Sequence, residues 1–271
     1  MTLSARTLAA GPGWEVADVV CTAGPRDKPF EEQHEAVSIA AVTTGSFVYR
    51  SARGTALLGP GAVLLGNPGE CFECGHEHGV GDRCIAFSFQ PAFFDALLSD
   101  VPGAARGLFA APGLPASEAM TGLLASLEAA RDEADADALE ELALRVAAAA
   151  AMGGAKPAAA GNPHPRDLRR VGEVIRLIEE RLDDNLGLGV LAVRAAMSPY
   201  HFLRTFRAVA GMTPHQYVLR LQLHRAAVRL RRTREAVSAI AFDAGFGDLS
   251  TFNRRFRRVM GMSPLRYRGA P

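Results

Sequence analysis

The chain lacks any run of about 18 consecutive apolar residues, so the sequence predicts no membrane-spanning helix. The segment from Met1 to Gly13 has no charged start followed by an apolar stretch, and we therefore expect no secretion signal and a cytoplasmic location. The Gly-x-Ser-x-Gly nucleophile motif, the phosphate-binding loop and the dinucleotide fingerprint are also missing. These absences favour a protein that works by binding, and we expect no catalytic residues.

Lysine is absent from Arg166 to the C-terminus, where 20 arginines outnumber 9 acidic residues and give a net charge of +11. The preceding part holds 10 basic and 20 acidic residues, a net charge of −10, so the overall charge of +1 conceals a strong asymmetry. A basic C-terminal half is expected to contact nucleic acid. The acidic N-terminal half is better suited to sensing or assembly.

Cysteine is scarce, with four residues in the chain, but three of them fall between Cys71 and Cys84. This pattern favours a cytosolic thiol or metal site over a disulfide scaffold. The same segment contains two histidines, and glycines at 75, 79 and 81 would let it fold around an ion. The sequence predicts that Zn²⁺ or another transition metal binds here, with these ligands: Cys71, Cys74, His76, His78 and Cys84.

Three acidic or imidazole side chains could add ligands or hydrogen bonds to this metal site: His34, Glu73 and Glu77. Two alternatives remain open. The thiols could sense an oxidant or electrophile, or they could pack as small apolar groups while the histidines face water. Cys21 stands apart in the sequence and is expected to be buried in a strand.

Two copies of one short pattern occupy the segment from Leu188 to Arg268. A constant offset of 50 residues relates the phenylalanines and the glycine of the first copy to those of the second: Phe202/Phe252, Phe206/Phe256 and Gly211/Gly261. A constant offset of this kind predicts a repeated structural unit.

Each copy has the pattern of a helix-turn-helix. A short apolar helix is followed by a turn and a helix-capping residue, Ser198 in the first copy and Asp248 in the second. The next helix has phenylalanine, phenylalanine and valine at i, i+4 and i+7 on one face and arginines on the other. A helix with one buried stripe and a basic opposite face is suited to the major groove of duplex DNA.

These motifs resemble those of the AraC/XylS family of bacterial transcription regulators, over the part of the chain from Arg166 onward. The resemblance rests on these residues: Met197-Ser198-Pro199, Phe202, Phe206, Gly211, Thr213-Pro214, Tyr217, Ile240-Ala241, Gly245-Phe246, Ser250, Phe252, Arg254, Phe256, Gly261, Ser263-Pro264 and Tyr267-Arg268. One position departs from the family pattern, because Gln222 and Leu223 stand where the family has arginine and leucine. An arginine contact there would be missing or would come from Arg220 or Arg225.

The resemblance places the base-contacting positions early in the second helix of each copy. They are Tyr200, His201, Leu203, Arg204, Leu249, Ser250, Asn253 and Arg254. Because a guanidinium group can donate two hydrogen bonds to guanine, Arg204 and Arg254 are expected to contact base edges. Phosphate contacts, which add affinity without sequence information, are expected from Arg207, Arg255, Arg257 and Arg258. The alternative for each arginine is a solvated face or a salt bridge.

The N-terminal half is predicted to be mainly β-structure, because residues 14–90 consist of short β-rich runs broken by glycine and proline. This part resembles the cupin-like effector domain of the same family through His34, Gly45, Pro60-Gly61 and the strand after Cys84; another small β-barrel is the alternative. Helices are expected at 92–98, 117–131 and 138–152. The last two would form a dimer seam or cover the barrel.

We therefore predict an α+β protein with a cupin-like β-barrel and following helices in 1–152, a linker in 153–165 and an all-α domain in 166–271. In the last domain, a long helix over 214–232 would hold two helix-turn-helix units about 34 Å apart, the spacing of successive major-groove faces. The resemblance implies a homodimeric transcription regulator, commonly an activator, that binds double-stranded DNA and works with RNA polymerase. Its barrel would sense a small molecule, a metal or a thiol-reactive species.

The competing interpretation is a cupin-type metal-dependent enzyme fused to a DNA-binding tail. His76 and His78 form the histidine pair that such an enzyme would need. However, no clear carboxylate follows at the usual cupin spacing, and no second histidine occurs later in the predicted barrel.

Overall fold

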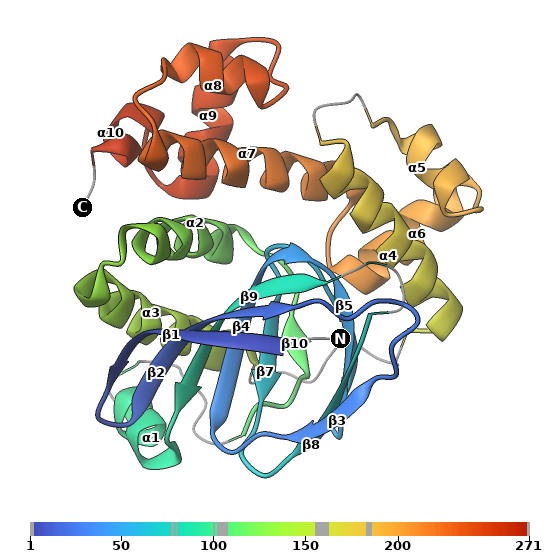
Figure 1. The fold of residues 1–271 in the computed structure, drawn as a ribbon. Helices are drawn as coiled ribbons and strands as arrows, with labels where there is room; N and C mark the ends of the chain where they lie inside the picture. The colour runs from blue at the N-terminus through green and yellow to red at the C-terminus, as the bar shows by residue number, and fades with distance from the viewer. Residues whose placement is uncertain are drawn as a thin grey trace.

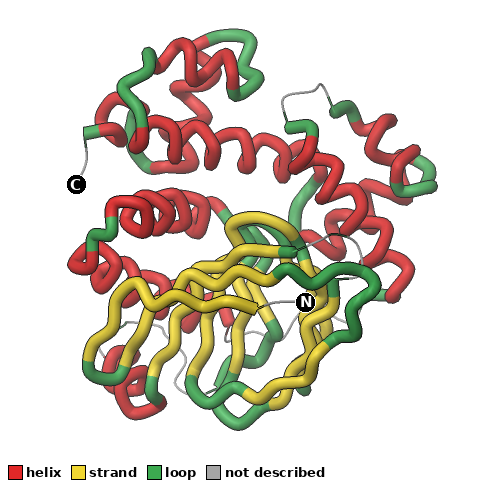
Figure 2. Tube along the Cα trace, in the orientation of Figure 1, coloured by secondary structure: helices red, strands yellow, loops and turns green. Residues whose placement is uncertain are grey.

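Two halves make up the protein in the computed structural model, which describes residues 3–76, 79, 81–99, 101, 108–154, 163–182 and 186–269. The N-terminal half contains the strands and the helices α1–α3, and the C-terminal half is helical (Figures 1 and 2). The two halves pack directly against each other, with α2 facing α7.

Two antiparallel sheets face each other in the N-terminal half, and their strand orders are β1-β2-β9-β4-β7-β10 and β3-β8-β5-β6. The strands are β1 (Leu3–Gly11), β2 (Trp14–Cys21), β3 (Phe30–Gln33), β4 (Val37–Gly45), β5 (Phe47–Ser51), β6 (Gly54–Leu58), β7 (Val63–Gly66), β8 (Cys71–Gly75), β9 (Asp82–Phe89) and β10 (Gly113–Leu114). Alternate residues of both sheets, including Val42, Tyr49 and Leu64, pack together between them.

The β-domain, as we call this pair of sheets, is the predicted cupin-like β-rich fold, and its two sheets form an open sandwich. Among the described strands, no hydrogen-bonded ladder joins one sheet to the other. The reason is that each sheet ends in edge strands paired on one side only: β1 and β10 in the larger sheet, β3 and β6 in the smaller. Strand β1 was not predicted, because its residues are largely exposed and its pairing is with β2 alone.

Three helices, α1 (Pro91–Ser99), α2 (Glu118–Glu133) and α3 (Ala136–Gly154), follow the sequence-based expectation closely. Leu127 and Val146 on α2 and α3 pack onto Ile39 and Phe87 of the larger sheet, so these helices cover the outer face of that sheet. Ser117 caps α2, and its side chain accepts a hydrogen bond from the backbone N–H of Met120. The predicted linker falls mostly on residues 155–162, which lie outside the described residues.

The C-terminal half contains α4 (Pro165–Glu180), α5 (Leu188–Arg194), α6 (Pro199–Ala210), α7 (Pro214–Arg232), α8 (Val237–Asp243), α9 (Leu249–Met260) and α10 (Pro264–Arg268). Helices α6 and α9 begin and end 50 residues apart, as the repeat predicted. Each ends at a glycine in the left-handed region, Gly211 at φ 75° and Gly261 at φ 77°, where a Cβ would be strained. The first unit (α5 and α6) and the second unit (α8 and α9) are therefore structural repeats.

Helix α7 connects the two units as a rod of 19 residues, about 28 Å long at 1.5 Å per residue. Thr213 and Gln216 form a reciprocal capping box at its start. The first unit lies at one end of this rod and the second unit at the other (Figure 1). In the part of the chain that the structure describes, none of the helices is long and apolar enough to cross a lipid bilayer.

Replacing Phe252 by alanine is expected to destabilise the second unit by about 3–5 kcal/mol, because the ring is fully buried between Phe246 and Phe256. Denaturant unfolding followed by circular dichroism measures the change. The control is Leu265→Ala, since Leu265 is 70% exposed and its truncation should change stability by less than about 0.5 kcal/mol. Equal effects of the two substitutions would contradict this assignment of the core.

Candidate nucleic-acid interface and β-domain cavity

The N-termini of α6 and α9 are fixed by matching caps. The Ser198 hydroxyl accepts a hydrogen bond from the backbone N–H of His201 at 3.4 Å, and the Asp248 carboxylate accepts one from Thr251 at 2.7 Å. The hydrogen bond from Thr251 lowers the pKa of Asp248, so the carboxylate remains charged at neutral pH. These caps define where each helix begins and therefore which side chains its first turns expose.

The predicted DNA-contacting side chains lie on the faces of α6 and α9 that point away from the buried phenylalanines. All but Leu203 are exposed: Tyr200, His201, Arg204, Arg207, Leu249, Ser250, Asn253, Arg254 and Arg257. Leu203 is half-buried, as is Arg255, whereas Arg258 is exposed. The structure thus gathers two exposed basic faces, one on each unit, while the role of each side chain in DNA binding stays a prediction.

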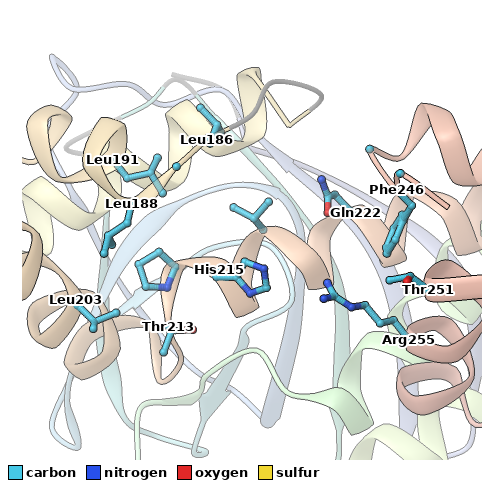
Figure 3. Close-up of a pocket in the computed structure, with 15 residues that line it drawn as sticks. Leu186, Leu188, Leu191, Leu203, Thr213, His215, Gln222, Phe246, Thr251 and Arg255 are labelled. Carbon is cyan, nitrogen blue, oxygen red and sulfur yellow. The ribbon is translucent and has the colours of Figure 1, made fainter.

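A cleft of about 810 Å³ lies between the two units along α7. Figure 3 shows Leu188, Leu191 and Leu203 of the first unit on one side and Phe246, Thr251 and Arg255 of the second unit on the other. His215 and Gln222 of α7 lie between these two groups (Figure 3). The cleft therefore connects the two units along one side of the C-terminal half.

Gln222, the departure from the family pattern, lines this cleft next to Gly245. Gly245 has φ 84°, a left-handed conformation that favours glycine, and a Cβ there would also lie 2.9 Å from the Gln222 side-chain nitrogen. Arg220 donates to the backbone carbonyl of Ala116, and Arg225 donates to that of Glu179. The contacts that Arg220 and Arg225 make are therefore within the protein, and Arg220 reaches across to the N-terminal half.

The contact between the two halves is partly apolar. Val48 and Leu57 of the smaller sheet belong to the same buried cluster as α4 and α6. Ala125 of α2 likewise belongs to the cluster formed by α7, α8 and α9. A Cβ on Gly211 would lie 2.5 Å from Pro115, so the chain approaches closely where α6 meets the N-terminal half.

Charged side chains add to this contact. On α2, Glu128 lies 2.8 Å from the His224 ring nitrogen, and Asp132 pairs with Arg232. The Glu179 carboxylate on α4 accepts a hydrogen bond from the backbone N–H of Gly45, at the end of β4, at 3.0 Å. Burial raises the pKa of Glu179 to about 7, against the opposing effects of that hydrogen bond and of Arg225.

The β-domain has a cavity of about 320 Å³ that is lined by both sheets and partly open to solvent. Its walls are mostly apolar, with Ala40, Leu64 and Phe72 among them, and His34 and His76 add polar groups. His34 Nε2 lies 2.8 Å from the Tyr49 hydroxyl, and its ring stacks on Phe72. Burial lowers the pKa of His34 to about 4, so this imidazole is neutral at physiological pH. A small, largely apolar molecule with a few polar groups fits such a site.

The structure does not bring all the predicted metal ligands together. Cys71 is exposed on β8, whereas Cys74, three residues later, faces the interior, because successive side chains of a strand alternate between its two sides. Cys84 and His76 are buried. His78 and Glu77 lie outside the described residues, and the Glu73 side chain pairs with Arg50 at 3.0 Å.

Burial raises the pKa of three thiols, Cys21, Cys74 and Cys84, and the nearby Asp82 carboxylate adds to this effect. A protonated thiol is a poor nucleophile. The buried thiols are therefore poorly suited to direct reaction with an electrophile in this conformation.

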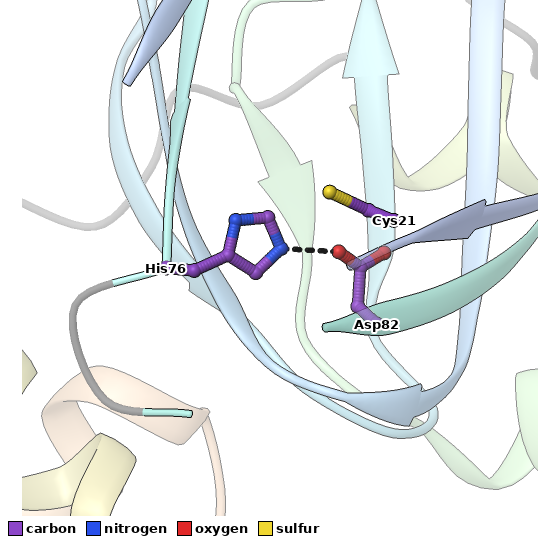
Figure 4. Close-up of side chains that lie close together, drawn as sticks. All are labelled: Cys21, His76 and Asp82. Carbon is purple, nitrogen blue, oxygen red and sulfur yellow. Dashed lines mark hydrogen bonds and ion pairs between the residues drawn. The ribbon is translucent and has the colours of Figure 1, made fainter. Parts of the chain in front are cut away.

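A different group of metal-ligating side chains meets in the β-domain. One ligand atom each from Cys21, His76 and Asp82 lies within 4.8 Å of the others. His76 Nε2 is 2.5 Å from Asp82 Oδ1, and the Cys21 sulfur lies on the same side of the ring (Figure 4). Sequence reasoning missed Cys21 and Asp82; the alternation that puts Asp82 and Cys84 on one face of β9 is the signal that could have found Asp82.

The fold and these surfaces define a two-domain transcription-regulator class, in which a ligand-binding β-domain precedes a tandem helix-turn-helix domain. The sequence matches the AraC-like ligand binding domain over residues 21–148 and a helix-turn-helix domain over residues 191–270. The chain belongs to the AraC/XylS family of transcription regulators.

Several named regulators are similar to about a third of this chain. The regulatory protein SoxS of Escherichia coli K12 is 35% identical over 98 residues, which cover 36% of this chain and 92% of SoxS. The transcriptional regulator Rv1931c of Mycobacterium tuberculosis is 46% identical over 83 residues, covering 31% of this chain. The chain spans about a third of the length of the relatives Rv1931c, LumQ and MtrA.

Among solved structures, the DNA-binding domain of AdpA in complex with a target DNA is 31% identical to this chain, with a TM-score of 0.36. The match covers 37% of this chain and 90% of the AdpA chain. ToxT of Vibrio cholerae with a bound unsaturated fatty acid is 10% identical, covers 95% of each chain and has a TM-score of 0.38.

Arg254→Ala is expected to weaken binding to the preferred duplex by about 1–3 kcal/mol and to relax the preference at one base pair, because bidentate base contacts carry that discrimination. Arg257→Ala is the matched comparison, since a lost phosphate contact weakens binding to all duplexes and reduces the salt slope by about 1. Fluorescence anisotropy with specific and random duplexes measures both. An equal loss on the two duplexes would show that Arg254 contacts only phosphate.

The raised pKa of Glu179 predicts a pH dependence of stability. A carboxyl with a raised folded-state pKa contributes stability below its ordinary pKa, about 4.5, and that contribution is lost as the pH rises through about 7. In Glu179→Gln, denaturant midpoints should therefore fall less between pH 5 and pH 8 than in the wild type. The control is Glu140→Gln, an exposed residue of α3 that should retain the wild-type profile. Parallel profiles for all three proteins would contradict this role of Glu179.

Proposed function

We propose that the protein is a sequence-specific DNA-binding transcription regulator whose β-domain binds a small effector. The observation that carries this proposal is the duplicated exposed basic face on α6 and α9, held at the two ends of α7. The strongly positive charge of the C-terminal half provides the sequence-independent attraction to phosphates. The named relatives are regulators, which favours this function over a cupin-type enzyme.

In the proposed complex, each unit places one helix in the major groove of successive turns on one side of a duplex. The α7 rod of about 28 Å is close to the helical repeat of about 34 Å, so one chain can reach both grooves. Arg204 and Arg254 contact base edges, and Arg207, Arg257 and Arg258 contact phosphates. The cleft lined by His215 and Gln222 faces the duplex between the two grooves.

The proposed effector binds in the 320 Å³ cavity and acts through the contact between the halves. Asp82, which lines the cavity, pairs with Gly45 in the β4–β9 ladder. The backbone N–H of the same Gly45 donates to Glu179 of α4. A ligand that moves the start of β9 therefore alters a hydrogen bond to the DNA-binding half, and this shifts the equilibrium between docked and released units.

We further propose a cytoplasmic homodimer that acts as an activator together with RNA polymerase, on the basis of the family resemblance. Leu144 and Met152 on α3 are exposed at 38% and 53%, so an apolar surface is available on the N-terminal half for assembly. Dimerisation through that half would leave α6 and α9 of each chain free for DNA.

Selection of bound duplexes from a random pool with the full-length chain tests the function. The expected result is an enriched sequence with two conserved blocks about 10 base pairs apart and an affinity that falls steeply with salt. The double variant Arg204→Ala/Arg254→Ala should lose this enrichment, whereas Arg176→Ala, on an exposed position of α4, should retain it. The absence of any enriched, salt-sensitive duplex would overturn the proposal.

A further inference from the structure

Three side chains from both sheets meet at one end of the β-domain cavity. Cys21 ends β2 and Asp82 begins β9, and the two residues are direct partners in the antiparallel ladder. Direct partners project from the same face of a sheet, about 5 Å apart at Cβ. His76 immediately follows β8 of the opposite sheet and reaches the same point (Figure 4). Cys21 is far from His76 and Asp82 in the sequence. The tertiary fold thus brings its thiol together with the imidazole and the carboxylate.

The side chains of this group are buried and make few hydrogen bonds. The side chains of His76 and Asp82 are 2% and 7% exposed. The Asp82 carboxylate has a hydrogen bond with His76 at one oxygen and one from the Cys84 thiol, at 3.2 Å, at the other. Among the described residues, nothing partners the buried Nδ1 of His76. Nδ1 is not the ring nitrogen that meets Asp82; the feature that points to a bound group is the meeting of three potential ligand atoms, one each from Cys21, His76 and Asp82, within 4.8 Å of one another.

We propose that Cys21, His76 and Asp82 bind a divalent transition metal of the Zn²⁺ class. Thiolate, imidazole and carboxylate are the ligand types that Zn²⁺ takes in proteins, at about 2.0–2.3 Å. One thiolate and one carboxylate neutralise the charge of a divalent ion, so the buried site carries no net charge. The set of three ligands leaves a fourth position for water or for a donor group of a molecule in the cavity, which these side chains line.

Metal binding requires a defined movement of protons. The Cys21 thiol releases its proton to solvent as the metal–sulfur bond forms, and His76 binds the metal through the Nε2 lone pair, which requires the ring to carry its single proton on Nδ1. The backbone N–H of Ala23 donates to the Cys21 sulfur at 3.4 Å, which favours the thiolate. The Cys84 thiol holds the second oxygen of Asp82 and so orients the carboxylate.

The proposed ligand set differs from the one that the sequence suggested, and the difference makes it testable. Cys71 is exposed and faces away from the interior position of Cys74 on the same strand. Cys71 therefore belongs to the sequence-derived set but cannot reach Cys21, His76 and Asp82 without a change in the register of β8. The metal site is also independent of the proposed DNA binding, because it uses no residue of the C-terminal half.

Metal content of full-length, untagged protein tests the site, with ZnCl₂ and CoCl₂ as the probes. The expected result is about one Zn²⁺ per chain by elemental analysis and, with Co²⁺, a sulfur-to-cobalt charge-transfer absorption. Cys21→Ser should abolish the charge-transfer band, and Asp82→Asn and His76→Gln should each weaken zinc binding at least tenfold. Cys71→Ser is the matched control and should bind zinc as the wild type does. Circular dichroism confirms that each variant is folded.

Less than about 0.2 metal ions per chain, with no uptake on titration, would overturn the proposal. An equal loss of zinc in Cys71→Ser and Cys21→Ser would also overturn it, in favour of the sequence-derived ligand set. If Cys21→Ser does not fold, His76→Gln and Asp82→Asn decide the question. Because zinc content is measured without DNA, failure of the metal site leaves the DNA-binding function untouched, and failure of the duplex selection leaves the metal site untouched.

Discussion

Helix α7 contributes buried side chains to both helix-turn-helix cores, and the arrangement of the C-terminal half depends on this sharing. Tyr217 and Leu221 belong to the core of the first unit, and Leu223 and Leu230 belong to the core of the second. Because one rigid helix serves both cores, neither unit can rotate about the rod without losing apolar burial. The relative position of α6 and α9 is therefore a property of the core and not of a flexible connection.

Each basic face depends in turn on the phenylalanines behind it. Phe206 contacts Tyr217 edge to face, and Phe256 contacts Tyr267 in the same way one repeat later. These rings are fixed by packing, so the arginines on the opposite face project in a defined direction. The exposed arginine side chains are solvated and are not packed in the protein core. Binding a polyanion through them therefore does not disturb the core.

The two halves are coupled through backbone as well as side chains. Gly45 has φ 73°, and a Cβ there would lie 2.3 Å from the Gly81 carbonyl oxygen, so the turn at the end of β4 can form only with glycine. That turn is adjacent both to Asp82 in the cavity and to Glu179 on α4. A short structural connection thus links the end of the cavity to the DNA-binding half.

The sequence alone determined the repeat, the caps and the exposed arginine faces, because helical periodicity and capping chemistry act over neighbouring residues. It also determined the β-rich nature of the N-terminal half and most of its helices. It could not show that the sheets form an open sandwich, because strand pairing joins residues far apart in the chain. Nor could it show which cysteines meet: adjacency in sequence suggested Cys71 and Cys74, but alternation along β8 separates them, and cross-strand pairing places Cys21 beside Asp82. Local physics specified the two exposed arginine faces that we propose contact DNA, and only the tertiary structure decided the composition of the buried site.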